Sequence, residues 1–182
     1  MAWSTPLTAS ANAVLNASQW NASVRDNLLM TAPNLATTAG RWFITSATNA
    51  IVERAIVQNT VDAADTLVNT TTYTNIATNG PIVSSVATGT QALVFIAARL
   101  SNSAVNVQSW ASYEVSGATT VAASDNWAIE GESPNIGNIV RHGATNLHTG
   151  LTTGNNTFRM QYRVETTSTG TFATRRLVVM AL

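Results

Sequence analysis

The first helical pattern of the chain covers residues 16–33, where Trp20, Val24 and Leu28 recur every four residues. This spacing places them in one apolar stripe along a helix. Asn16 and Gln19 stand at the spacing of a capping box, and Pro33 marks the expected end of the helix. A lone amphipathic helix before a β-rich chain is either an attachment element or a helix that packs on its own domain.

The rest of the chain has the pattern of short strands and turns. Residues 41–45 and 50–57 are predicted to form a hairpin, and the polar residues 58–66 a linker. Turn signals then follow about every ten residues from residue 67 onward. This spacing predicts a mainly β protein whose body is an antiparallel β-sandwich or jelly roll. We therefore expect an arm and helix at 1–35, a neck hairpin and linker at 36–66, and a β-domain at 67–182.

Three segments define the expected core of this domain. Residues 91–100 are apolar on both faces and are predicted to form a central strand. Residues 157–165 alternate strictly, with Phe158, Met160, Tyr162 and Val164 on the inner face. Residues 176–182 are apolar to the last position, which predicts a strand inside the sheet or at a subunit contact.

The composition points to an assembly. Only 10% of the 182 residues are charged, with nine basic and nine acidic, whereas an average globular protein has about 25%. So few charges suggest that neighbouring subunits cover part of the surface, which favours a homo-oligomer. The zero net charge argues against a nucleic-acid partner, and no segment has the length or apolarity of a membrane span or a signal peptide.

The residues with chemical potential are few. Cysteine is absent, and no nucleophile elbow, phosphate loop or zinc motif occurs. His142 and His148 lack metal spacing, so we expect ordinary histidines. Asp125, Glu130 and Glu132 are a candidate calcium site or glycosidase pair, although solvated carboxylates are the simpler interpretation. We therefore predict no catalytic, cofactor or metal-binding residues.

Two tryptophans and two arginines complete the candidates. Trp110 and Trp127 offer flat rings for a sugar ligand, but rings on a sheet more often lie in the core or at a subunit contact. Arg175 and Arg176 are interpreted as a charged strand edge that blocks unwanted pairing.

The first third of the chain resembles a known group of proteins. The opening MAWSTP and the later VLNASQWNASVRDNLLMTAP are similar to the N-terminal segment of many virion proteins of tailed phages that infect actinobacteria. The matching positions are Trp3, Pro6, Asn21, Val24, Arg25, Asp26, Asn27 and Leu28. The similarity covers roughly residues 1–57. The body is generically similar to trimeric jelly rolls of the tumour necrosis factor type that cap phage fibres and decorate capsids.

The resemblance implies a structural role in the virion, on the capsid exterior or the tail. The leading hypothesis is a trimeric capsid decoration protein without enzymatic activity, docked on the major capsid protein or another virion protein. Its expected docking residues are Trp3, Leu7, Leu15, Trp20, Val24, Arg25, Asp26 and Leu28. The alternative is a minor tail or tail-fibre protein that binds a host receptor or carbohydrate through Trp110 and Trp127. The remaining alternative is a glycan hydrolase that uses the acidic group.

Overall fold

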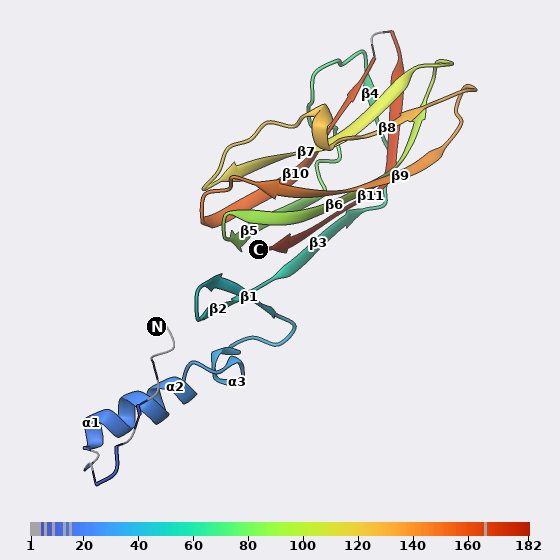
Figure 1. The fold of residues 1–182 in the computed structure, drawn as a ribbon. Helices are drawn as coiled ribbons and strands as arrows, with labels where there is room; N and C mark the ends of the chain where they lie inside the picture. The colour runs from blue at the N-terminus through green and yellow to red at the C-terminus, as the bar shows by residue number, and fades with distance from the viewer. Residues whose placement is uncertain (1–4, 6, 9, 13, 15, 166) are drawn as a thin grey trace. The chain divides into compact units, whose positions relative to one another are not determined.

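The computed structural model describes residues 1–182 except 1–4, 6, 9, 13, 15 and 166. The chain forms two compact units, Met1–Ala55 and Ile56–Leu182 (Figure 1). The arm, the helix and the hairpin thus belong to one unit, and the second unit begins earlier than the sequence pattern predicts.

The first unit contains the predicted helix in a modified form. It runs as α1 (Ala17–Trp20), a π-helical segment (Asn21–Arg25) and α2 (Asp26–Leu28). The capping box is confirmed, because the Asn16 side chain accepts from the Gln19 amide and the Gln19 side chain accepts from the Asn16 amide. Two backbone N–H groups at the start of the helix, which have no partner within the helix, thereby gain hydrogen bonds.

The predicted end of the helix at Pro33 is wrong. The helix closes after Leu28 with i→i+3 hydrogen bonds from the Met30 and Thr31 amides. Pro33 instead lies in the first turn of a separate helix, α3 (Ala32–Leu35), where its missing N–H costs nothing. In the described part of the chain, no helix is long and apolar enough to cross a membrane.

The predicted hairpin is present with shifted limits. β1 (Trp42–Ala47) pairs antiparallel with β2 (Ala50–Arg54), and Asn49 takes the positive φ of 55° that the tight turn requires. The carboxylate of Glu53 accepts hydrogen bonds from the amides of Thr37 and Thr38, so β2 holds the segment after α3.

The second unit is an antiparallel β-sandwich of the jelly-roll type, as predicted. Its strands are β3 (Ile56–Val61), β4 (Asp65–Val68), β5 (Ile82–Thr88), β6 (Gln91–Asn102), β7 (Gln108–Gly117), β8 (Ile129–Glu132), β9 (Val140–Thr149), β10 (Gly154–Val164) and β11 (Thr169–Ala181). One sheet has the order β5-β10-β7-β8 and the other β3-β11-β6-β9, with β4 also paired to β11. The two sheets thus contain four and five strands, and eight of these strands interleave in the order typical of a jelly roll.

The expected polar linker at 58–66 is wrong. Residues 56–61 are β3, which pairs with β11 from Ile56–Met180 to Val61–Arg175. β3 is an edge strand of its sheet, and Gln58 and Thr60 lie exposed on it. Because these positions are polar, the segment has the composition of a linker. The alternation of apolar and polar residues that indicates a strand is therefore weak in its sequence.

The core lies between the two sheets and follows the predicted alternation. Phe158, Met160, Tyr162 and Val164 of β10 are fully buried. The residues paired with them across β7, which include Ala111, Tyr113 and Val115, are buried too. β6 is central as predicted, and Ala92, Val94, Ile96 and Leu100 point inward. However, β6 is buried on one face only, because Phe95 on the other face is 36% exposed.

Arg175 is the largest fully buried side chain, so its interpretation as part of a charged strand edge is wrong. Its Nη1 donates to the carbonyl oxygens of Thr78 (2.9 Å) and Gly80 (3.1 Å), and its Nη2 to that of Ala63 (3.3 Å). β11 is a central strand, which leaves no edge for this residue to block. Arg176 is exposed.

A β-bulge explains why Arg175 points inward. The register between β11 and β6 shifts between Ala173 and Arg176, and Thr174 has a φ of 48°. The extra residue of a bulge reverses the alternation, so Phe172 and Arg175 both face the core although they are three positions apart.

We predict that Arg175→Ala lowers the free energy of unfolding by about 3–5 kcal/mol. The substitution leaves three carbonyl oxygens without their charged donor and opens a cavity. Arg176→Ala is the matched control, with an expected change within about 0.5 kcal/mol because the neighbouring side chain is exposed. Urea unfolding measures both, and equal effects of the two substitutions would contradict the assignment.

Candidate functional site

The expected docking residues that the structure describes lie on the surface of the first unit. Trp20 is 56% exposed and Leu28 61% exposed, while Val24 between them is half-buried. Leu7 is exposed, and its amide donates to the Ser23 hydroxyl (2.9 Å). Trp3 and Leu15 lie outside the described residues. Of the three residues predicted to form the stripe, Trp20 and Leu28 are thus exposed and Val24 is half-buried, and a π-helical segment lies between Trp20 and Leu28.

The two charged residues of this helix pair with each other. The guanidinium of Arg25 contacts the Asp26 carboxylate at 2.7–2.8 Å, and both side chains are exposed. Asn27 from the same motif is buried, and its amide donates to the Ser23 carbonyl oxygen (3.1 Å). Within the motif, Asn27 thus supports the helix while Trp20 and Leu28 are available for a partner.

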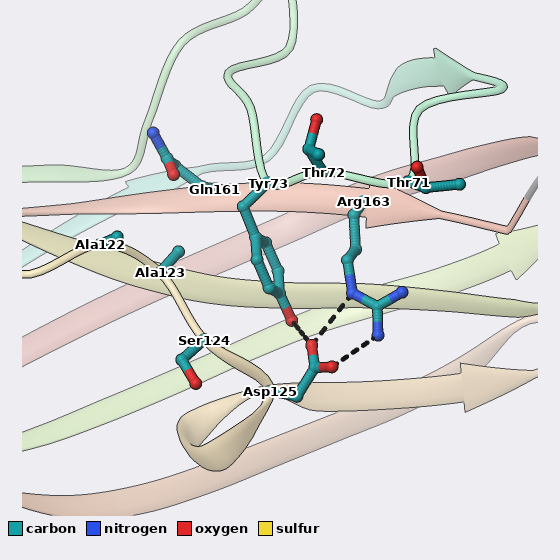
Figure 2. A pocket seen from close by; sticks show the side chains of 9 residues that line it. All are labelled: Thr71, Thr72, Tyr73, Ala122, Ala123, Ser124, Asp125, Gln161 and Arg163. Carbon is teal, nitrogen blue, oxygen red and sulfur yellow. Dashed lines mark hydrogen bonds and ion pairs between the residues drawn. The ribbon is translucent and has the colours of Figure 1, made fainter.

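The second unit carries an open hollow of about 610 Å³ beside β10 (Figure 2). Three segments form it: the residues between β4 and β5, the residues before and in the 3-10 turn Asp125–Trp127, and β10. Its lining is rich in hydroxyl, amide and carboxylate groups and consists of Thr71, Thr72, Tyr73, Ala122, Ala123, Ser124, Asp125, Gln161 and Arg163.

Asp125 is the centre of the polar contacts in this hollow. Its carboxylate accepts from the Tyr73 hydroxyl (2.6 Å) and from Nε (3.0 Å) and Nη2 (2.8 Å) of Arg163, as Figure 2 shows. The bidentate arrangement fixes the carboxylate plane. The Asp125 side chain is still 61% exposed, so its oxygens remain accessible to a ligand.

Arg163 is held between two aromatic rings. Its guanidinium carbon lies 3.6 Å from the centroid of Trp110 and 5.5 Å from that of Tyr73. Trp110 is the register partner of Arg163 on β7. Cation–π contact and the ion pair with Asp125 therefore fix this arginine from three sides.

These contacts also determine the protonation states of Asp125 and Tyr73. The hydrogen bonds from Arg163 and then from Tyr73 hold the pKa of Asp125 below its usual value, so the carboxylate is ionised at neutral pH. Burial, and then the hydrogen bond to Asp125, raises the pKa of Tyr73, which stays protonated. The hollow thus offers a fixed negative acceptor among neutral hydroxyl groups.

The acidic residues singled out in the sequence do not form a common site. Asp125 pairs with Arg163, whereas Glu130 accepts from the Trp110 indole nitrogen (3.0 Å). Glu132 lies at the far end of β8, opposite Gln108. Among the described residues, no group of three or more His, Asp or Glu side chains is arranged to hold a metal ion.

The two candidate tryptophans are buried or half-buried, which agrees with the simpler interpretation of the sequence and not with free rings for a sugar. Trp110 is 7% exposed and covered by Arg163, so it has no free face for a sugar. Trp127 is half-buried, and its indole donates to the Tyr113 carbonyl oxygen (2.9 Å). The aromatic residue that does line the hollow is Tyr73, which lies in a polar segment and carries no local signal.

Of the two histidines, only His148 is buried. Its Nδ1 lies 3.2 Å from the Tyr113 hydroxyl, and its ring packs edge-on against Trp127. Burial lowers the pKa of His148. His142 is on the same strand but is exposed.

Comparison with known proteins gives weak similarities only. A scan of protein-family models and a search of curated proteins found no match. Among solved structures, the VP2 subviral particle of infectious bursal disease virus is 12% identical, with a TM-score of 0.45 over 76% of this chain. The D431N mutant of that VP2 protein is 11% identical, also with a TM-score of 0.45 over 76%.

A second kind of solved structure is similar to a comparable degree. The Eiger TNF of S. frugiperda is 11% identical, with a TM-score of 0.39 over 67% of this chain and 93% of its own. The chain spans only about a third of the VP2 proteins, 35% and 37% of their lengths. With TM-scores below 0.5, these similarities assign no function.

We predict that acidification destabilises the fold through His148. Because the pKa of His148 is lowered in the folded chain, the unfolded chain binds the proton more readily. The contribution of His148 to stability is therefore fully present above its pKa in the unfolded chain, about 6.5. The free energy of unfolding then falls as the pH drops below that value. Urea titrations between pH 7.5 and 5 measure this loss. His148→Asn reduces the slope, and the exposed His142→Asn retains it.

Proposed function

We propose that this chain is a non-enzymatic structural protein of a tailed-phage virion. It docks on the particle through the first unit, while the jelly-roll unit decorates or stabilises the particle as a homo-oligomer of three copies. The partner is the major capsid protein or another virion protein. The proposal rests on the resemblance of residues 1–57, not on the structural similarities.

The structural observation that supports docking is the exposure of two apolar side chains on the helix within these residues. Trp20 and Leu28 lie on a capped helix with more than half of each side chain exposed. An exposed tryptophan and leucine on one ordered element are typical anchors of a protein interface, since buried aromatic and aliphatic groups supply most of the binding energy. The compact unit that carries them is separate from the jelly-roll core.

We predict that Trp20→Ala combined with Leu28→Ala weakens binding to virions assembled without the protein by at least 100-fold. Each truncation at an interface centre costs about 2 kcal/mol or more. Cosedimentation of the full chain with such particles measures the loss. Val14→Ala is the control, because Val14 is apolar and exposed in the same unit but lies outside the helix. Unchanged binding of the double variant would overturn docking through this stripe.

The hollow at Asp125 favours a second function, the binding of a host carbohydrate by a minor tail or tail-fibre protein. A fixed, ionised carboxylate and nearby hydroxyl groups are suited to the hydroxyl groups of a sugar. This proposal transfers the predicted site from the tryptophans to Tyr73, Asp125 and Gln161.

We predict for this alternative that Asp125→Asn lowers binding to host cell-wall polysaccharide at least tenfold. The amide retains the shape of the carboxylate but loses the charge that accepts the ligand's hydroxyl groups. Glu132→Gln is the control, because Glu132 is an exposed carboxylate that does not line the hollow. Microscale thermophoresis with the purified polysaccharide measures both variants. If the wild-type chain does not bind the polysaccharide, the tail-receptor alternative is excluded for that host.

A further inference from the structure

The outer face of the sheet β3-β11-β6-β9 contains an unbroken apolar row. The strand register places Ile56 beside Met180, Met180 beside Leu93, and Leu93 beside Leu147. Register partners share a face, so these four side chains cross all four strands. The next row adds Val178 and Phe95. We call these six residues the apolar face.

The apolar face is not part of the sandwich core. Its neighbours along the same strands, including Ala92, Val94 and Val179, are fully buried between the sheets. On the apolar face, by contrast, Ile56 and Leu147 are each 54% exposed. The core is therefore complete without the apolar face, which meets water in the single chain.

The size of this sheet surface matches a stable interface. Strands lie about 4.8 Å apart with about 3.3 Å per residue, so four strands along the twelve residues of β6 cover roughly 700 Å². A standard interface buries about 800 Å² on each partner. The six apolar residues fall in two adjacent rows of this surface, and the other outward positions, which include Arg99, Arg141 and Arg176, supply a polar rim.

Three arginines determine which end of this surface meets a partner. Arg99 and Arg141 are register partners beyond the apolar face, and the exposed Arg176 lies between them and the apolar face. None of the three forms an ion pair with another described residue. Overlaying these arginines from two copies would bring like charges together. Copies that meet through the apolar face instead leave the arginines at the rim.

We propose that the apolar face is the contact through which copies of this chain associate with one another. The six residues have no charged group and no side-chain hydrogen-bond donor, and the polar side chains that flank their second row, Gln58 and Thr145, are exposed at its ends. An identical apolar face therefore complements these six residues without burying an unpaired polar group among them. This inference deepens the homo-oligomer in the proposed function by assigning it a surface. It depends on neither the capsid nor the tail location.

The test is the oligomeric state of the full chain by sedimentation equilibrium over a range of concentrations. We expect the wild-type chain to associate, and Leu147→Asp and Ile56→Asp each to raise the dissociation constant at least 100-fold, because a buried carboxylate without a partner is strongly unfavourable. Both positions are exposed in the single chain, and an unchanged circular dichroism spectrum establishes that the variants fold.

Ile136→Asp is the matched control. Ile136 is 73% exposed in the segment between β8 and β9, outside the apolar face, so this variant is expected to associate like the wild type. Raising NaCl from 0.1 to 1 M should leave the association constant unchanged or higher, because apolar contact is not screened by salt. A tenfold weakening in salt would indicate a contact between charged surfaces and overturn the proposal.

The remaining outcomes separate this inference from the proposed function. A wild-type chain that stays monomeric at all concentrations, or aspartate variants that associate normally, would overturn the apolar face as the contact. Particle binding of the same samples is measured independently. A monomer that still binds particles refutes this inference and the homo-oligomer but leaves docking through the first unit intact, whereas an oligomer that does not bind particles refutes only the docking proposal.

Discussion

The buried guanidinium of Arg175 is the interaction on which the jelly-roll unit most depends. It joins the carbonyl oxygens of Ala63, Thr78 and Gly80 to β11. Ala63 lies in the short connection between β3 and β4, whereas Thr78 and Gly80 lie in the long connection between β4 and β5, whose two strands belong to opposite sheets. The charge is offset in part by Asp65, whose pKa is lowered mainly by the Thr78 amide and also by Arg175. A central strand thus holds the segment that leads to Tyr73 and the hollow.

The two outer faces of the sandwich have different physical characters. The sheet with β7 and β10 presents ion pairs and hydrogen bonds, with Asp125, Glu114 and their arginine partners. The sheet with β6 and β11 presents Ile56, Phe95 and Leu147, and beside them lie arginines that form no ion pair with the described residues. Both ion pairs found among the described residues of the second unit lie on one side of the sandwich, which leaves the other side suited to contact with protein.

The prediction from sequence succeeded where a local rule decides the structure. The capping box needs only Asn16 and Gln19, and β10 alternates because each of its residues faces either the core or solvent. The prediction failed where pairing with another strand determines the local structure. β3 resembles a linker because it is an edge strand with exposed polar residues, and Arg175 resembles an edge charge because the bulge at Thr174 leaves no signal in composition.

The amino-acid sequence by itself determined the mainly β fold class, the capped start of the helix and the inner residues of β10, because periodicity along one segment specifies a face. Only the tertiary structure decided that Trp110 lies beneath Arg163, that Tyr73 reaches Asp125, and that apolar residues of four strands form one row. These contacts join residues far apart in the chain, and the register that brings them together is set by strand pairing rather than by any local pattern.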